Sequence, residues 1–356
     1  MYVETKHVLA PAEEKKIRIL CIDGGGIRGI IPAQILLRLE NKIREITGNQ
    51  DAMLAQYFDF MAGTSTGGIL TSIYLFPDNK NPNAPKFSAK DALDLYVKNG
   101  NEIFNKMKKE KIPLLGDLWD EKYSAKNFEN LLKDYFKDTT IDKLLKPCLI
   151  TAYDIENRCT KFFTSHDSKK NSDRNFLVRD VCRATSAGPT YFEVAKIKSM
   201  MNVSYSLIDG GVFANDPTLC AYSEIRKSAE NPSASDMFIF SVGTGNVDTS
   251  YAYSKARKWG LLGWGKPIID IMMSSSSETT KYHLKNMFSV SNSDDYYVRV
   301  EPKSLLLANP EMDDASEENI EHLFKVGATT AEQNEGLINS VAKFVIENGE
   351  RQVIYN

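Results

Sequence analysis

Short apolar runs alternate along the chain with longer segments of helical periodicity. The run 17–22 ends at Asp23 and three glycines, which is typical of a buried strand that stops at a turn. Pro32 then suits a first helical turn, and apolar residues recur at helical spacing until Gly48. Further strands are expected at 57–62, 148–154, 161–164, 204–208 and 237–242, and helices at 68–75, within 88–137, and at 175–186, 266–287 and 316–345. This alternation predicts a layered α/β fold with a mostly parallel sheet.

Composition narrows the class of protein without naming a function. The 356 residues are 42% hydrophobic and 26% charged, as in a globular protein. The formal charge of −3 argues against nucleic-acid binding, which normally needs a basic excess. Five scattered cysteines, with no CxxC, indicate free thiols rather than a zinc site. The first fifteen residues lack an apolar core, so we expect no secretory leader and a cytoplasmic protein.

The stretch 57–76 has the length of a membrane helix and carries one charge, Asp59. Its centre, however, reads Gly-Thr-Ser-Thr-Gly-Gly, which suits an uninterrupted apolar helix poorly. We therefore expect a buried strand, a tight turn and a buried helix here, and no transmembrane segment.

That turn contains a G-x-S-x-G pattern. Ser65 stands between Gly63 and Gly67, after an apolar strand and before an apolar helix. A nucleophilic serine on a sharp strand-to-helix turn has a strained backbone, and small neighbours let the strand and helix pass each other. The alternative is a glycine-rich turn that only connects two core elements.

A glycine loop follows the first strand. Gly24, Gly25 and Gly26 can present bare backbone N–H groups at the start of a helix, and Arg28 adds a cation nearby. Such donors suit the oxyanion that develops in acyl transfer. Together with Gly29, the loop also satisfies G-x-G-x-x-G, a dinucleotide-binding pattern. Both interpretations are open at this point.

A third motif ends the predicted strand at 204–208. Asp209 is followed by Gly210 and Gly211, which is compatible with a simple Asx turn or with a catalytic base. A free carboxylate with a pKa of ~3.9 is a weak base toward an alcohol. Burial in an apolar pocket would raise that pKa and make Asp209 a better base for Ser65.

The three motifs, in this order, resemble the patatin-like phospholipases. The likeness extends to 183–192, where Gly188 stands in place of the usual alanine, and to 241–245 and 311–316. The resemblance implies a three-layer α/β/α fold around a mixed, mostly parallel sheet. It also implies one catalytic domain over 17–350 after an N-terminal extension over 1–16.

The same resemblance implies residue roles and a substrate class. Ser65 would be the nucleophile and Asp209 the base, with no catalytic histidine. The expected oxyanion region is Gly24, Gly25, Gly26 and Arg28. The implied activity is hydrolysis of fatty-acyl esters of phospholipids or galactolipids at a membrane surface, without a metal or other cofactor. Plant patatins begin with a secretory leader and this chain shows none, so localisation is not carried over.

Three alternatives compete with this interpretation. An α/β-hydrolase triad would need His283 or His322 after Asp209, but both fall in helical patterns among charged neighbours. A dinucleotide-binding module needs an acidic residue about 20 residues beyond the glycines, where Glu45 lies inside a predicted helix. A scaffold that binds lipid without cleaving it would not need Ser65 and Asp209.

Two further segments have chemistry of their own. Acidic residues at 313–318 lack EF-hand spacing and suit the first turn of a helix, where carboxylates meet the positive end of the dipole. Trp259 and Trp264 lie in a glycine-interrupted apolar segment, where they would either enter a membrane interface or cover the core.

Overall fold

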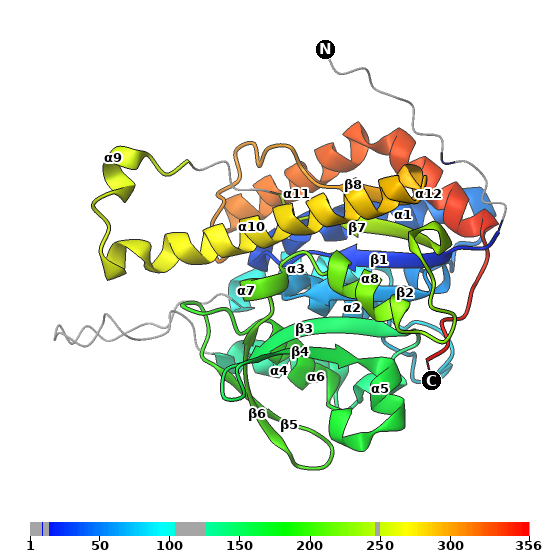
Figure 1. Cartoon of the computed structure of the whole chain (residues 1–356), viewed down its shortest axis with the longest axis horizontal. Helices are drawn as coiled ribbons and strands as arrows, with labels where there is room; N and C mark the ends of the chain where they lie inside the picture. Colours follow the sequence, from blue (N-terminus) through cyan, green and yellow to red (C-terminus); the bar gives the residue numbers. More distant parts are fainter. Residues whose placement is uncertain (1–8, 10–13, 104–124, 246–249, 356) are drawn as a thin grey trace.

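A mixed sheet of eight strands forms the centre of the molecule (Figure 1). The computed structural model describes residue 9 and residues 14–103, 125–245 and 250–355. The strands are β1 (Ile17–Ile22), β2 (Phe60–Thr64), β3 (Cys148–Asp154), β4 (Cys159–Thr164), β5 (Ala195–Lys198), β6 (Ser204–Asp209), β7 (Met237–Val242) and β8 (Tyr297–Val300). Strands β8, β7, β1, β2 and β3 are mutually parallel, whereas β4 and β6 run antiparallel to β3, and β5 antiparallel to β6. The predicted mostly parallel mixed sheet is confirmed.

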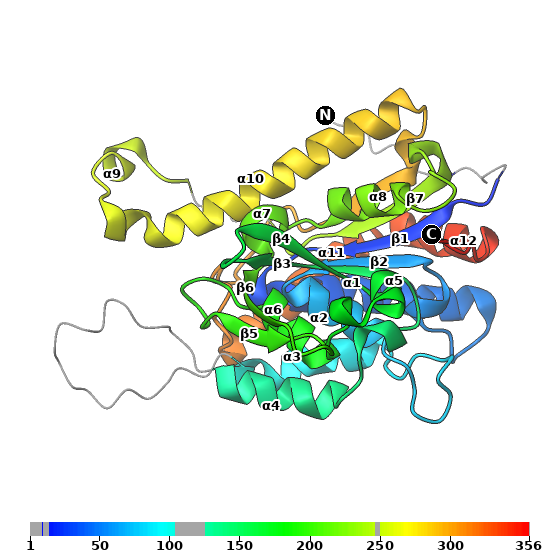
Figure 2. The same ribbon diagram turned by 60° about the horizontal axis from the view of Figure 1, so that its bottom comes forward.

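Two layers of helices enclose this sheet, because its central strands are apolar on both faces (Figure 2). One face packs against α1 (Ile30–Thr47), α2 (Thr66–Tyr74), α3 (Ala89–Ile103), α6 (Val178–Thr185), α11 (Glu317–Gln333) and α12 (Glu335–Glu347). The other face packs against α8 (Thr218–Arg226) and the second half of α10 (Leu261–Val290), through Tyr222, Leu284 and Phe288. The fold is therefore the predicted three-layer α/β/α arrangement.

One charged side chain interrupts the apolar pattern of β1. The guanidinium of buried Arg18 donates to both carboxylate oxygens of Asp59, at 2.7 and 2.9 Å, and to the backbone oxygen of Val345 at 2.8 Å. A buried charge is tolerated when it is paired and hydrogen-bonded in this way. The pair joins the start of β1 to the loop before β2 and to α12.

The expected elements are present with shifted ends, beside several short elements that were not predicted. Strands 17–22, 148–154 and 237–242 have the predicted bounds, and the helix expected at 266–287 extends to Leu261–Val290. The stretch 57–76 forms β2, a turn and α2, and no helix among the described residues is long and apolar enough to span a membrane. Residues 104–124, inside the predicted helical region 88–137, lie outside the described residues, which resume at α4 (Ala125–Phe136). Strands β5 and β8 were not predicted.

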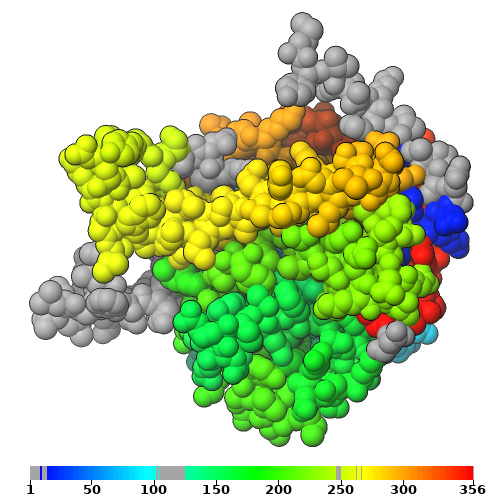
Figure 3. All heavy atoms as spheres, viewed as in Figure 1, coloured from blue at the N-terminus to red at the C-terminus, as the bar shows by residue number. Residues whose placement is uncertain are grey.

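The short helices α5 (Ser165–Lys170), α7 (Gly211–Ala214) and α9 (Tyr253–Ala256) complete the described helices. Helix α9 and the first half of α10 project beyond the rest of the described molecule (Figures 1 and 3). The second half of α10 lies on the sheet, so this helix connects the core to the projection.

Candidate active site

Ser65 occupies the turn between β2 and α2. Its φ of 53° and ψ of −121° fall where a residue with a side chain is strained. The Ser65 N–H donates to Oγ1 of Thr185 at 2.8 Å, and that hydroxyl donates in turn to the backbone oxygen of Thr151 at 2.6 Å. Thr185 on α6 thus holds the strained turn against β3, a contact that the sequence motif did not reveal.

The glycines on either side of Ser65 allow a very close backbone approach. A Cβ on Gly67 would lie 2.0 Å from the backbone oxygen of Ile22, and one on Gly63 would lie 2.1 Å from the oxygen of Gly67. Neither position has room for a side chain, so α2 could not start beside β1 and β2 with larger residues here.

Asp209 reaches Ser65 through the register of the sheet. Strand β2 pairs with β3 as far as Thr64 opposite Thr151. Strand β6 runs along the same side of β3 from the other direction and stops with Asp209 opposite Ala152. The two strands therefore end at neighbouring residues of β3, which brings the Ser65 and Asp209 side chains together at the wall of one cavity.

The surroundings of Asp209 favour a base that works near neutral pH. Burial raises the pKa of Asp209 to about 6, although hydrogen bonds from Ser65 and the Gly211 N–H act in the opposite direction. The Gly211 N–H lies 2.7 Å from Oδ1 of Asp209. Gly210 packs so closely on Thr151 that a Cβ there would lie 2.1 Å from Oγ1. The two glycines thus fix the loop that carries the carboxylate. With a pKa of about 6, Asp209 is ionised above about pH 6.

The glycine loop after β1 lies beside the serine. A Cβ on Gly24 would lie 3.3 Å from the Cβ of Ser65. The Gly24 N–H donates to the backbone oxygen of Asn215 at 3.0 Å, and the Gly24 carbonyl accepts from Oγ1 of Thr244 at 2.7 Å. The loop is thus anchored to the segment after β6 and to the segment after β7.

Some backbone N–H groups of this loop are hydrogen-bonded and others are not. That of Gly24 is engaged by Asn215, and that of Ile27 donates to the Met312 oxygen at 2.9 Å. Within the part of the chain that the structure describes, no hydrogen bond uses the N–H of Gly25 or Gly26. These two donors are therefore the ones free to meet an oxyanion, which is a narrower set than the sequence suggested.

Arg28 lines a different cavity from the one in front of Ser65. Its guanidinium is buried, donates to the Gly245 oxygen at 3.2 Å and lines a smaller cavity together with Asp270. Burial lowers the pKa of Arg28, and the nearby Asp270 opposes that change.

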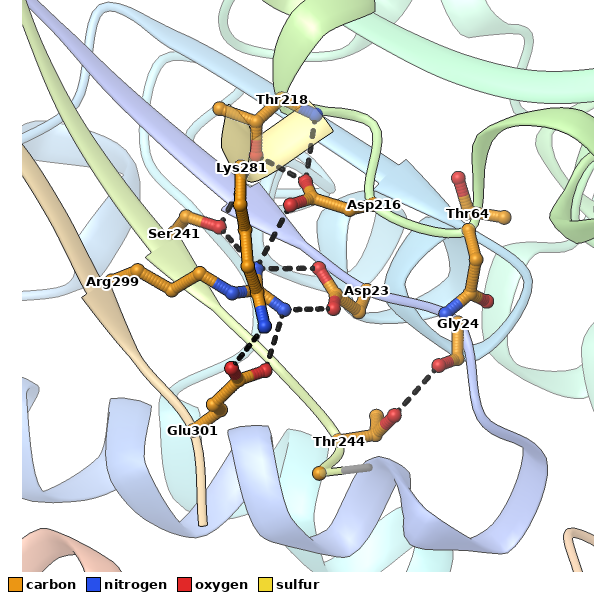
Figure 4. A network of polar contacts seen from close by, with 12 residues as sticks. Asp23, Gly24, Thr64, Asp216, Thr218, Ser241, Thr244, Lys281, Arg299 and Glu301 are labelled. Atoms are coloured by element: carbon orange, nitrogen blue, oxygen red, sulfur yellow. Dashed lines mark hydrogen bonds and ion pairs between the residues drawn. The ribbon is translucent and has the colours of Figure 1, made fainter. Parts of the chain in front are cut away.

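A buried ionic cluster holds the base of the loop (Figure 4). Nη1 and Nη2 of Arg299, on β8, lie 3.1 and 2.5 Å from the two carboxylate oxygens of Asp23, at the end of β1. Nη1 also lies 3.0 Å from Asp216 and 2.6 Å from Ser241, and Nη2 lies 2.8 Å from Glu301. One guanidinium thus connects the residue before Gly24 to the segment that follows the Asp209 loop.

Burial and neighbouring charges shift the pKa values of the carboxylates in this cluster in opposite directions. Burial raises the pKa of Asp23 to about 7, while the Arg299 cation lowers it and Asp216 raises it further. Glu301 is also desolvated, which would raise its pKa, but Arg299 and Lys281 outweigh burial and hold that pKa below its usual value. Sequence alone identified Asp23 as the start of the glycine loop and offered no signal that Arg299 is its partner.

An apolar cavity of about 60 Å³ lies in front of Ser65 and Asp209. Its apolar wall includes Ile69, Ile103, Phe128, Phe192, Ile269 and Met273. A serine beside a carboxylate at the wall of such a cavity can attack an ester whose apolar part enters the cavity.

Comparison with known proteins agrees with this geometry. A family model described as patatin-like phospholipase matches residues 20–222. Patatin-like protein 2 of Oryza sativa subsp. indica is 35% identical over 91% of this chain and 86% of its own length. Patatin-15 of Solanum tuberosum is 35% identical over 89% of this chain and 84% of its own. The chain belongs to the patatin-like phospholipase family.

One solved structure is also similar, with a score too low to carry weight. VipD from Legionella pneumophila aligns with 89% of this patatin-like chain and 68% of its own, at a TM-score of 0.33 and 13% identity.

The segments that resemble patatins outside the three motifs also lie at the site. From 183–192, Ser186, Gly188 and Tyr191 line the cavity. Thr244, from 241–245, and Met312, from 311–316, contact the glycine loop. A Cβ on Gly188 would meet its nearest atom, in Tyr191, at an ordinary 3.5 Å, so the usual alanine would fit there.

The histidines that the structure describes lie away from the serine. His166 is bonded to Glu224 at 3.1 Å and stacked on Tyr355. His283 is exposed on α10 and His322 is partly exposed on α11, and neither lines the Ser65 cavity. His7 lies outside the described residues.

The remaining alternatives find little support in this patatin-like fold. Glu45, the candidate dinucleotide ligand, is exposed on α1 and pairs with Lys42. Among the described residues, no cluster of three His, Cys, Asp or Glu is placed to hold a metal ion. Glu317 and Glu318 form the first turn of α11, after the N-cap Ser316, as predicted for the acidic segment.

Proposed function

We propose that this chain is a lipid acyl hydrolase that cleaves fatty-acyl esters of phospholipids or galactolipids, with Ser65 as nucleophile and Asp209 as base. Family membership supports the reaction class. The observation that carries the residue assignment is the position of Ser65 and Asp209, which end neighbouring strands and line the same apolar cavity.

The reaction proceeds in two steps. Asp209 accepts the hydroxyl proton as the Ser65 oxygen attacks the ester carbonyl, and the N–H groups of Gly25 and Gly26 stabilise the oxyanion. Collapse of the tetrahedral intermediate expels the alcohol, which takes the proton from Asp209, and leaves an acyl-Ser65 ester. Asp209 then accepts a proton from a water molecule as the water oxygen attacks that ester. Collapse of the second tetrahedral intermediate releases the fatty acid, and Asp209 returns the proton to the Ser65 oxygen.

The dyad is favoured over a triad by position and by electrostatics. A pKa of about 6 leaves Asp209 mostly ionised at neutral pH, yet basic enough to accept a proton during attack. The described histidines lie elsewhere, so the Asp209 carboxylate would accept the Ser65 proton without an intervening histidine. Arg28, which lines a separate cavity, would contribute through its positive field rather than by touching the oxyanion.

Fatty-acid release from mixed phospholipid and galactolipid vesicles, in the presence of a chelator, tests the proposal. We expect release by the wild type and a loss of at least three orders of magnitude in Ser65→Ala and Asp209→Asn. Ser72→Ala is the matched control, because Ser72 is also buried on α2 and bonds back to the Gly68 oxygen of its own helix. It should retain the wild-type rate.

A fluorophosphonate probe gives an independent readout of the nucleophile. It should label the wild type and Ser72→Ala, and fail to label Ser65→Ala. Equal activity in Ser65→Ala, with the fold intact by circular dichroism, would exclude Ser65 as the nucleophile. A comparable loss in His283→Ala or His322→Ala would favour the triad.

A further inference from the structure

An apolar stripe lies on the projecting half of α10. Leu261 is 95% exposed, and Trp264 is 40% exposed. The remaining members are Ile268, Ile271 and Met272, which are also exposed. Spacings of three and four residues place these side chains on one face of the helix. A surface helix normally presents polar side chains to water, so this contiguous apolar face indicates a binding partner.

The stripe is continuous with the wall of the Ser65 cavity. Ile269 and Met273 lie on the same turns of α10 as Ile268 and Met272, and both line that cavity. One helix therefore presents apolar side chains to the cavity and to the exterior. Figures 1 and 3 show the start of α10, with α9, projecting past the body of the molecule, whereas Ile269 and Met273 further along the helix reach the cavity.

The segment that leads into the stripe is cationic and aromatic. Lys255, Arg257 and Lys258 are exposed, and no ion pair between described residues engages them. Residues 250–269 contain no Asp or Glu. The rings of Trp259 and Trp264 meet edge to face with centroids 5.1 Å apart. Cations flanking an amphipathic aromatic surface suit the boundary between anionic headgroups and acyl chains.

We propose that the stripe, together with the cations at 255–258, docks this chain on an anionic lipid bilayer. Continuity with the cavity favours a bilayer. A second copy docked symmetrically through the same stripe would instead bring its own cations at 255–258 against these. This inference rests on the proposed function in one respect, namely that the substrate is a lipid ester. Docking would place the cavity wall at the membrane, so that an acyl chain could pass along α10 to Ser65.

Vesicle co-sedimentation in a Ser65→Ala background separates docking from catalysis. The probes are vesicles of phosphatidylcholine alone and vesicles of phosphatidylcholine with about 30 mol% phosphatidylglycerol. The anionic lipid gives the second kind a strong negative surface potential. One variant carries Leu261→Ser with Ile268→Ser, and the second carries Lys255→Glu, Arg257→Glu and Lys258→Glu. Val290→Ser is the control, since Val290 is 86% exposed at the other end of α10.

We expect the Ser65→Ala protein to bind the anionic vesicles more tightly than neutral ones. Reversal of the three cations should weaken binding to the anionic vesicles by at least about 100-fold. The Leu261→Ser, Ile268→Ser variant should weaken binding to both, while Val290→Ser should not change it. In the active background, both variants should hydrolyse a water-soluble monomeric ester at the wild-type rate and hydrolyse vesicle lipid slowly.

Two results would overturn the inference. Vesicle binding that is unchanged in both variants would show that the stripe does not dock. A concentration-dependent dimer in sedimentation velocity, abolished by Leu261→Ser, would assign the stripe to a second copy of the chain. By contrast, normal vesicle binding without hydrolysis of any ester would refute the proposed function and leave the docking surface supported.

Discussion

Replacement of Arg299 by Met would test how the glycine loop is held. The substitution keeps an unbranched apolar side chain in β8 and removes the cation shared by Asp23, Asp216 and Glu301. Breaking a buried ion pair by deleting one partner costs about 3–5 kcal/mol, because the other charge stays buried without compensation. With an unfolding entropy that scales with chain length, this corresponds to a fall in Tm of about 4–7 °C.

The loss should depend on pH in a defined direction. In the folded protein Asp23 already has a pKa of about 7, above its ordinary value of 3.8. The wild type therefore loses stability as the pH rises from 3.8 to about 7, because the unfolded chain releases this proton first. Removing Arg299 raises that pKa further and makes the ionised carboxylate more costly. At pH 5.5 Asp23 is protonated in both folded proteins, so the difference in Tm should be smaller there than at pH 8.

Thermal unfolding at pH 5.5 and pH 8, followed by circular dichroism, measures both effects. Arg38→Met is the matched control, since exposed Arg38 also donates twice to one carboxylate, that of Glu335, and should cost at most about 1 kcal/mol. Arg299→Lys should recover part of the stability. The rate on a soluble ester should fall in Arg299→Met with KM little changed, because the displaced loop affects the oxyanion more than the cavity.

An Arg299→Met protein as stable as the wild type at pH 8 would refute this reasoning. So would a loss that grows on acidification, since the buried carboxylates would then not be the source of the cost.

Three further predictions concern the turn, the loop and the base. The rate on a soluble ester should rise as the pH passes through about 6 and level off above it, as Asp209 ionises; a profile flat from pH 5 to 8 would contradict this. Gly26→Ala should lower kcat by about 10²–10³, because its Cβ would lie 2.2 Å from a backbone oxygen, whereas Gly48→Ala, also at positive φ but with nothing within 4 Å, should leave kcat unchanged. Thr185→Val should destabilise the protein by about 1–3 kcal/mol in thermal unfolding and slow labelling by fluorophosphonate, because the buried Ser65 N–H loses its acceptor.

Local patterns predicted most of the core. The apolar runs of β1, β3 and β7 leave little choice but buried strands, and the small residues around Ser65 allow only a tight turn. Strands β5 and β8 escaped prediction because each has four residues and alternates buried with more exposed positions. So short an alternation is stable only as an addition to an existing sheet, and no local signal marks it.

The sequence by itself determined which residues had the chemistry: a serine on a strand-to-helix turn, a carboxylate at the end of a strand and glycines after another. Only the tertiary structure decided that Ser65 and Asp209 meet, because β2 and β6 end head to head on β3. It also decided that Arg28 bonds to the Gly245 oxygen in a separate cavity and that Arg299 holds Asp23. Hydrophobic periodicity specifies elements locally, whereas strand register and the partners of buried charges depend on residues far apart in the chain.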